Sequence, residues 1–252
     1  MRRPAAAALL AALLGPLVAL PAAAAPRVVS LNLCTDQYLL ALAPEQAAAV
    51  THLARDPTLS VLAEAARAVP TVRADAEAVL ALRPDLVLAA PWGAQVTLAA
   101  LARRGVRVER FALPDSFEAI RATTREIAAL LGVPARGEAL LAGFDFPSAP
   151  PRGMAIALEP RGLTAAPGSL RDAVLRAAGY ANASDGRAMG LEALARRPEV
   201  LLVVAPPPPT PSRATEFLAH PLLAGHVRRE VPAALTICGG PRTARAVALL
   251  AP

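Results

Sequence analysis

Two cysteines, Cys34 and Cys238, have the most varied chemical options in this sequence. An even number of cysteines in an exported protein is typical of a disulfide. Thiolates also bind soft metal centres, and free cysteines are often buried as small apolar residues. A disulfide requires the two Cα atoms to lie within about 7 Å, so the sequence leaves a bridge, metal-facing thiolates and free thiols all open.

Histidines and nucleophilic motifs are too few to predict catalysis. The three histidines, His52, His220 and His226, have no zinc-binding spacing. The chain has no HExxH, GxSxG or phosphate-loop motif, and no GxGxxG after a predicted strand. We therefore expect no enzyme, no cofactor and no metal site. An exported α/β enzyme is the alternative class.

Arginine and tryptophan side chains are candidate ligand contacts. All 26 basic residues are arginine, and Arg55 and Arg242 lie where they could hold an anion by charge-assisted hydrogen bonds. Trp92, the only tryptophan, follows a predicted strand and could stack on a planar ring. The alternatives are ordinary surface arginines and a partly buried packing tryptophan.

The composition excludes several classes of protein. With 55% hydrophobic and 18% charged residues among 252, the chain can bury a large core and is not disordered. The formal charge of +6 is spread along the chain without a basic stripe, and only 3% of residues are aromatic. We therefore expect no nucleic-acid partner.

Residues 1–24 have the pattern of an export signal. Two arginines at positions 2–3 precede an apolar stretch at 5–20, and a run of alanines follows. This order is typical of a secretory signal peptide, with cleavage after Ala24. A membrane anchor is the alternative, but prolines interrupt the stretch and it is short for a span of about 20 residues. We predict a soluble protein of the periplasm.

Helix and strand patterns alternate through the rest of the chain. Short apolar runs between helices predict parallel sheets that are covered on both faces. The predicted strands are 27–31, 47–51, 86–90, 106–111, 154–158 and 235–238. The predicted helices are 35–42, 76–82, 95–103, one that Asp115 or Ser116 caps and that runs to 131, 134–146, 170–178 and 243–250. The four prolines at 206–209 are interpreted as a surface connector.

One block occurs twice, at 77–91 and 192–206. Each copy has a glutamate, a helix, a proline that ends the helix, an acidic residue and an apolar strand. Such joints are common in α/β proteins, but two distant copies favour two similar lobes. We divide the chain into an N-terminal α/β lobe at 25–131, a connecting helix at 132–151 and a C-terminal α/β lobe at 152–252.

Ordered motifs along the chain resemble a known family. They lie at 28–36, 77–88, 168–170, 192–206, 220–222 and 238–243. In this order they are similar to the substrate-binding proteins of ABC importers for cobalamin, iron–siderophore complexes or haem. The resemblance implies two Rossmann-like lobes joined by a single backbone helix, the class III periplasmic binding proteins. It also implies capture of a metal chelate and delivery to an ABC permease dimer; a sensor without a transporter is the alternative.

Ligand contacts are expected where strand ends and helix starts of both lobes converge on a cleft. The candidate residues at those places are Asn32, Leu33, Cys34, Thr35, Arg55, Trp92, Gly93, Gly168, Ser169, Cys238, Gly239 and Arg242. Cys34 and Cys238 map to opposite lobes, so a disulfide would staple the lobes and oppose their opening.

Glu77 and Glu192 are the predicted contacts to the permease. In the family that the chain resembles, one exposed acidic residue per lobe docks onto one permease subunit, and the repeat places these two equivalently. Ion pairs of this kind set encounter and orientation more than affinity. The alternative is an ordinary glutamate in a first helical turn, favoured by the helix dipole. We expect the binding protein itself to be a monomer.

Overall fold

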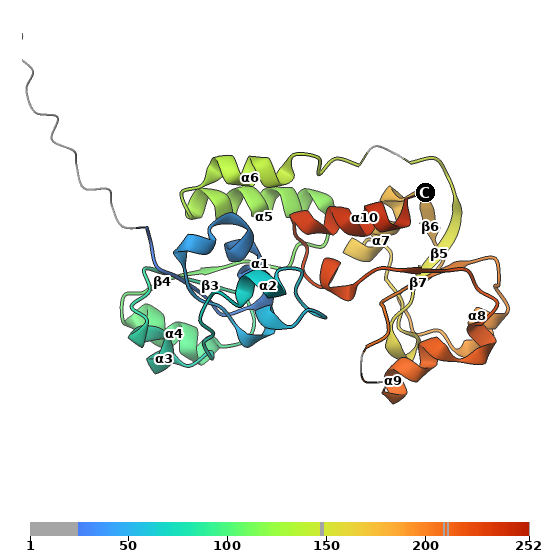
Figure 1. The fold of residues 1–252 in the computed structure, drawn as a ribbon, viewed down its shortest axis with the longest axis horizontal. Coiled ribbons are helices and arrows are strands. Elements are labelled where there is room, and N and C mark those ends of the chain that lie inside the picture. Colours follow the sequence, from blue (N-terminus) through green and yellow to red (C-terminus); the bar gives the residue numbers. More distant parts are fainter. Residues whose placement is uncertain (1–24, 147–148, 209, 211, 252) are drawn as a thin grey trace, which may run out of the picture.

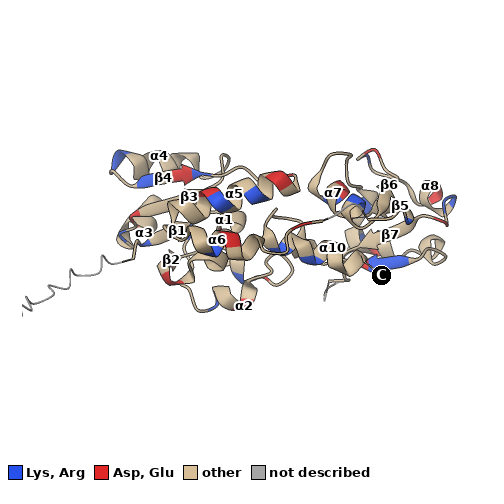
Figure 2. Ribbon diagram, turned by 90° about the horizontal axis from the view of Figure 1, so that it is seen from above, with Lys and Arg blue, Asp and Glu red and all other residues tan. Residues whose placement is uncertain are grey.

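The computed structural model describes residues 25–146, 149–208, 210 and 212–251, and the predicted signal peptide lies outside them. Figure 1 shows two lobes side by side, each built on its own sheet. Basic and acidic positions are interspersed over both lobes (Figure 2). Among the described helices, none is long and apolar enough to cross a bilayer.

The N-terminal lobe is built on a parallel sheet with the strand order β2-β1-β3-β4. Apolar clusters cover both faces of this sheet, so its central strands are buried, as expected for a parallel sheet. The strands are β1 (Val28–Ser30), β2 (Ala47–Ala49), β3 (Leu86–Ala89) and β4 (Arg107–Arg110). The helices around it are α1 (Leu33–Leu42), α2 (Ala63–Ala66), α3 (Ala76–Ala81) and α4 (Gln95–Arg103).

The C-terminal lobe repeats this topology with the strand order β6-β5-β7-β8, again parallel. Its strands are β5 (Gly153–Ala157), β6 (Tyr180–Asn182), β7 (Leu201–Val204) and β8 (Arg228–Glu230). Its helices are α7 (Leu170–Ala177), α8 (Leu191–Ala195), α9 (Arg213–Glu216) and α10 (Ala244–Leu250). The pairs α3–β3 and α8–β7 have equivalent places in the two lobes. The predicted fold class and the interpretation of the repeated block are therefore confirmed.

The last predicted strand, 235–238, is wrong. Residues Ala233–Leu235 form a 3-10 helix, and the fourth strand is β8, which consists of three exposed charged residues at the sheet edge. Charged residues on an edge strand discourage pairing with another chain. Because they show no alternation of apolar and polar residues, the sequence pattern did not predict this strand. Other short 3-10 helices lie at Pro44–Gln46, His52–Arg55, Pro160–Gly162, Phe217–Ala219, Pro221–Leu223 and Pro241–Thr243.

The connection between the lobes begins as a pair of packed helices, α5 (Phe117–Leu130) and α6 (Pro134–Leu141). They approach closely at Gly137, where a Cβ atom would lie 2.7 Å from the Cβ of Ala128. The predicted helix 134–146 is too long: it ends at Leu141, and Gly143 adopts a left-handed φ of 80°. The described residues between Leu141 and β5 form no helix. The lobe boundaries themselves stay a prediction.

An aromatic cluster fills the joint where the chain crosses between the lobes. Phe117, Phe144 and Phe146 lie with ring centroids 4.6–5.6 Å apart. Leu170 of α7 and Ala244 of α10 complete the cluster from the C-terminal lobe. Three of the five phenylalanines in the sequence are therefore used to pack the lobes together.

Candidate functional site

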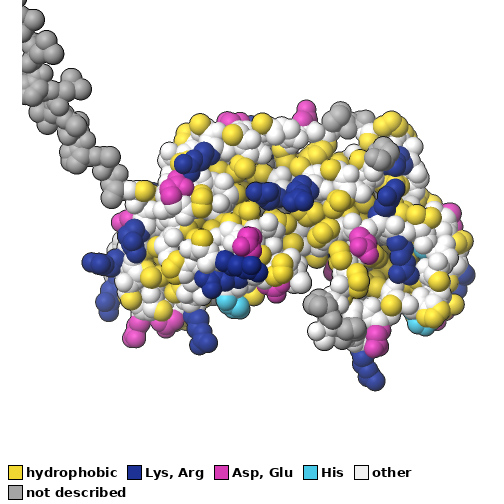
Figure 3. All heavy atoms as spheres, in the orientation of Figure 1, with side chains coloured by type: hydrophobic (Ala, Val, Ile, Leu, Met, Phe, Trp, Pro, Cys, Tyr) yellow, Lys and Arg dark blue, Asp and Glu magenta, His cyan; other side chains and the backbone are white. Residues whose placement is uncertain are grey.

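A large cavity lies at the carboxyl ends of the C-terminal lobe's strands and has a volume of about 970 Å³. This is at the upper end of the range for small-molecule sites, about 300–1,000 Å³. The residues that follow β5, β7 and β8 line it from the C-terminal lobe, and residues 57–59 line it from the N-terminal lobe. Figure 3 shows the surface hollowed between the lobes.

Residues 57–59 reach the cavity because the preceding residue shapes a tight turn. The Asp56 carboxylate accepts hydrogen bonds from the Thr58 backbone N–H at 2.8 Å and from its hydroxyl at 2.7 Å. These bonds hold the pKa of Asp56 below its usual value. The turn presents Pro57, Thr58 and Leu59 to the other lobe.

The loop after β7 also lines the cavity. Pro206, Pro207 and Pro208 are among its lining residues. Pro206 and Pro207 are exposed, as a surface connector requires, and the three prolines line the cavity as well; Pro209 lies outside the described residues. They reach the cavity because β7 is a central strand that ends there.

Five charged side chains stand in the largely apolar wall: Glu159, Arg171, Glu216, Arg228 and Glu230. Arg171, in the first turn of α7, forms an ion pair with Glu159, and its Nε donates to the Thr236 hydroxyl at 3.2 Å. Burial lowers the pKa of the Arg171 guanidinium, but an arginine stays charged in proteins. The prediction missed this arginine because its sequence context is that of any arginine in a first helical turn.

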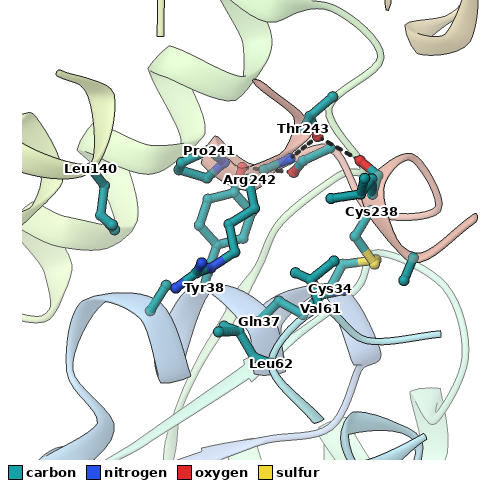
Figure 4. A pocket seen from close by; sticks show the side chains of 15 residues that line it. Cys34, Gln37, Tyr38, Val61, Leu62, Leu140, Cys238, Pro241, Arg242 and Thr243 are labelled. Carbon is teal, nitrogen blue, oxygen red and sulfur yellow. Dashed lines mark hydrogen bonds between the residues drawn. A yellow bond between two sulfur atoms is a disulfide. The ribbon is translucent and has the colours of Figure 1, made fainter. Parts of the chain in front are cut away.

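Cys34 and Cys238 form a disulfide with a Cα–Cα distance of 5.2 Å. Of the three alternatives open from the sequence, the bridge is the one that the structure shows. It joins the first turn of α1, in the N-terminal lobe, to the segment that leads into α10. The disulfide borders a small hollow of about 30 Å³, and Figure 4 shows the side chains that line it.

The backbone around the disulfide is packed closely against the N-terminal lobe. The Tyr38 hydroxyl donates to the carbonyl oxygen of Gly239 at 2.8 Å, and burial raises the pKa of Tyr38. A Cβ atom on Gly239 would lie 2.3 Å from the carbonyl oxygen of Pro114. We call Cys34, Tyr38, Pro114, Cys238 and Gly239 the interlobe contact.

The other predicted residues on α1 serve its local structure. The Asn32 side chain accepts from the backbone N–H of Cys34 at 2.9 Å and so caps the helix. The Thr35 hydroxyl lies 2.7 Å from that of Ser30, and Leu33 packs beside the disulfide. Because these groups already have partners, a ligand would have to compete with them.

A buried carboxylate on α1 holds the segment that follows β2. Asp36 has no exposed surface and accepts a hydrogen bond from the Thr51 backbone N–H at 3.2 Å. Burial raises the pKa of Asp36 to about 6, although the hydrogen bonds from Thr51 lower it.

Two predicted anion contacts, Arg55 and Arg242, lie outside the large cavity. Arg55 donates to the carbonyl oxygens of Ala66 at 3.2 Å and Val69 at 2.6 Å, so it ties its loop to the end of α2. Arg242 lines the small hollow beside the disulfide, together with Cys34, Cys238 and Gly239.

The remaining candidates follow strands but do not line the large cavity in this structure. Trp92 is 53% exposed in the loop after β3, next to Gly93 with its left-handed φ of 73°. The backbone N–H of Gly168 donates to Asp172 at 2.8 Å, and Ser169 caps α7. Binding roles for all twelve candidate residues stay predictions.

Glu77 and Glu192 have matching positions in the two lobes. Each is the second residue of its helix, in the first turn of α3 and of α8, and each is exposed. Figure 1 shows these helices on the outer parts of the two lobes.

Few side chains in the described structure could hold a metal. It contains no group of three or more His, Cys, Asp or Glu residues suited to a metal ion. His226 is buried, and its Nε2 lies 3.1 Å from the Leu194 carbonyl oxygen. The described residues that line the large cavity include no His, Tyr, Cys or Met.

Comparisons with known proteins agree with this geometry. A family model described as "Periplasmic binding protein" matches residues 28–226. A periplasmic heme-binding protein from Pseudomonas aeruginosa is 26% identical, with a TM-score of 0.62 over 89% of this chain and 91% of that chain. No curated protein sequence matches the chain.

Two further solved structures have the same fold. The heme-binding protein BhuT, in complex with two hemes, is 26% identical, with a TM-score of 0.64 over 89% of this chain and 96% of that chain. The vitamin B12 binding protein BtuF of Vibrio cholerae is 18% identical, with a TM-score of 0.61 over 89% and 94%.

Proposed function

This chain belongs to the periplasmic binding protein family, and from that premise we propose that it captures a metal chelate in the periplasm and delivers it to an ABC importer. Its two parallel-sheet α/β lobes have the class III fold of that family. The observation that carries the proposal is the cavity of about 970 Å³ at the strand ends, lined from both lobes.

The chemistry of the cavity wall favours one kind of chelate. Proteins hold haem iron through His, Cys, Met or Tyr, and the described lining residues include none of these. The tyrosines lie elsewhere, Tyr38 at the interlobe contact and Tyr180 in the core of the C-terminal lobe. A corrinoid or a ferric siderophore brings its own metal ligands. We therefore favour these two classes over haem.

Trp92 and Gly93 do not line the large cavity, and they are proposed to contact a part of the ligand that extends beyond it. The indole is exposed in the loop after β3, and a flat apolar ring stacks well on a conjugated macrocycle. Replacing Trp92 by alanine should weaken binding about tenfold, which corresponds to about 1.4 kcal/mol. A Trp92→Phe variant, which keeps an aromatic ring, should retain most of the affinity.

Ligand titration tests the proposal. Purified protein would be titrated with cyanocobalamin, a ferric hydroxamate siderophore and haem, with calorimetry and the fluorescence of the single tryptophan as readouts. We expect saturable binding of one of the first two. Binding of none of them, together with turnover of a substrate, would favour the exported enzyme instead.

Glu77 and Glu192 are proposed as the docking residues for the two permease subunits. The support is their matching, exposed position in the two lobes. Replacing both with glutamine should leave ligand affinity unchanged and reduce transport in vesicles that contain the permease. Glu118→Gln is the control, since Glu118 is also exposed in a first helical turn. Unchanged transport in the double variant would reject the docking role, and a protein that binds but serves no permease would be a sensor.

A further inference from the structure

Five exposed arginines gather at one edge of the N-terminal lobe. They lie at the amino ends of its parallel strands and at the ends of the helices beside them: Arg27, Arg83, Arg103, Arg104 and Arg107. We call these five residues the basic edge. They come from three distant parts of the chain, and for this reason the sequence shows no basic stripe. Only the fold brings their charges together.

The sheet places these residues side by side. Val28 of β1 pairs with Leu86 of β3, and Leu86 pairs with Arg107 of β4, so the three strands begin at the same level. Arg27 precedes β1, and its Nη2 donates to the carbonyl oxygen of Leu82, at the end of α3, at 3.0 Å. Figure 2 shows basic positions at the end of α4 and on β4. The ends of both helices therefore lie beside the starts of the strands.

Acidic side chains near this edge do not balance its charge. Asp85 accepts a hydrogen bond from a backbone N–H at 2.7 Å, and Glu109 pairs with Arg107. Before the outer strand β2, Glu45 pairs with Arg136. The other arginines at positions 83, 103 and 104 make no side-chain hydrogen bond and no ion pair within the described residues. The edge therefore keeps a net positive charge.

Most arginines at the equivalent edge of the C-terminal lobe serve that lobe's own structure. Arg152 donates to the Leu250 carbonyl oxygen at 2.8 Å and lies over the ring of Tyr180. Arg197 and Arg228 also donate to backbone carbonyl oxygens. The contrast shows that the three arginines without partners in the basic edge have side chains available to another molecule.

Two observations indicate what that molecule is. The edge has no aromatic residue for stacking on bases, since Trp92 and Phe111 follow the opposite ends of β3 and β4. The described chain begins at Ala25, two residues before Arg27, and the apolar stretch at 5–20 of the export signal directly precedes it in the sequence. A secretory signal is held at the membrane during export, so this edge is the part of the lobe that adjoins the membrane-directed segment.

We propose that the basic edge is a docking surface for an anionic phospholipid bilayer, and that it concentrates the mature protein at the periplasmic face of the membrane. Each arginine close to an anionic lipid surface strengthens binding about fivefold. The attraction is electrostatic, so salt weakens it. It is also reversible, because a few surface arginines do not anchor a protein permanently.

This surface is compatible with the proposed docking to a permease. Glu77 lies in the first turn of α3, and Arg83 follows the end of the same six-residue helix, about 9 Å farther along. A receptor docked through Glu77 would thus hold the basic edge near the lipid around the permease. The lipid interaction itself does not depend on that docking or on any ligand.

Vesicle binding tests the inference. Purified protein without residues 1–24 would be sedimented with phosphatidylcholine vesicles that contain or lack phosphatidylglycerol. We expect binding at least about tenfold tighter to the anionic vesicles at low ionic strength, and its loss at high ionic strength. The triple variant Arg83→Gln, Arg103→Gln and Arg104→Gln should bind the anionic vesicles on the order of a hundredfold more weakly.

Two double variants separate the edge from the overall charge. Arg103→Gln with Arg104→Gln leaves the turn before β3 intact and should weaken binding about twentyfold. Arg73→Gln with Arg110→Gln removes the same charge from two exposed arginines at the carboxyl ends of the same sheet, and should change the affinity by no more than about twofold. Melting temperatures check that both variants stay folded.

Three results would overturn the proposal: native protein that binds both kinds of vesicle equally, equal losses in the two double variants, or tighter binding to duplex DNA than to the anionic vesicles. The last result would assign the edge to a different polyanion. None of these results would affect chelate capture, which the ligand titration tests separately, and failure of that titration would leave the vesicle result standing.

Discussion

The central strands of the two lobes, β1 and β5, occupy equivalent places in their sheets, but the segments that follow them do different work. After β1 the chain enters the interlobe contact through Cys34 and Tyr38. After β5 it runs along the large cavity through Leu158 and Glu159. One topology therefore supplies a permanent contact from one lobe and most of a binding wall from the other.

The difference lies in how the polar groups are satisfied. At the interlobe contact, a disulfide, a buried hydrogen bond and a close backbone approach leave a hollow of only about 30 Å³. At the cavity, loops that contain prolines and charged side chains surround about 970 Å³. The first arrangement stabilises the relation between the lobes; the second keeps space for a ligand.

Of the changes considered for the two regions, removal of the disulfide should have the largest effect on the free energy of unfolding. Replacing Cys34 and Cys238 with alanine releases a loop whose ends are 204 residues apart. We expect a loss of about 4 kcal/mol in the free energy of unfolding, from denaturant titration under oxidising conditions. Ligand affinity should fall as well, because the lobes would then have to be ordered by the ligand.

Reduction of the native protein gives an independent check of the same effect. A reductant should destabilise the native protein by a similar amount and leave the double variant unchanged. If the double variant is as stable as the oxidised native protein, the disulfide is not what holds the interlobe contact.

Asp36 lies on α1, the helix that carries Cys34 and Tyr38 of the interlobe contact, and should make the stability of the protein depend on pH. Its pKa of about 6 lies above the usual value of 3.8, so between about pH 4 and pH 6 the folded protein binds more protons than the unfolded chain. Stability should therefore fall as the pH rises through that interval. Relative to Asp36→Asn, the native protein should lose about 2 kcal/mol between pH 4 and pH 7, from denaturation curves at each pH.

A second carboxylate provides a control of opposite sign. The pKa of Asp56 is lowered by its hydrogen bonds with Thr58, so it contributes stability above its usual pKa that is lost as the pH falls. Compared with Asp56→Asn, the native protein should gain stability as the pH rises through that acidic range. The same sign for both aspartates would mean that burial does not determine the titration of Asp36.

Gly239 tests the close approach at the contact. A Cβ atom there would overlap the Pro114 carbonyl oxygen, so Gly239→Ala should cost about 2 kcal/mol of unfolding free energy in denaturant titration. The adjacent Gly240 is a matched control, because its nearest Cβ contact would be 4.0 Å and its φ of −160° suits any residue. Equal losses in the two variants would argue against the close approach.

Much of the architecture could be predicted because it depends on local patterns. Apolar strands, prolines that end helices and the repeated block are short-range signals, and the helix at 95–103 has the predicted bounds. The β8 strand could not be found this way, since its three charged residues at a sheet edge show no apolar alternation.

The site was harder to predict because it depends on which loops of the two lobes lie close together in the folded protein. Whether Cys34 and Cys238 bridge is a question of distance between lobes, which no local pattern contains. A proline after a strand indicates a turn in any loop, so nothing in the sequence shows that Pro206, in a surface connector, also lines a cavity. Asn32 was predicted as a ligand contact after the first strand, and in the structure its side chain caps the helix that follows.

The Tyr38 hydroxyl should give the smallest effect. Tyr38→Phe keeps the buried ring but leaves the Gly239 carbonyl oxygen without this donor, so we expect a loss of about 1 kcal/mol in unfolding free energy. Tyr180→Phe is the control, since the described structure gives the Tyr180 hydroxyl no hydrogen bond although its ring is buried. If the hydrogen bond also aligns the two lobes, Tyr38→Phe should weaken ligand binding slightly and Tyr180→Phe should not. A loss as large as that from removing the disulfide would mean that the hydrogen bond, and not the covalent bridge, dominates the interlobe contact.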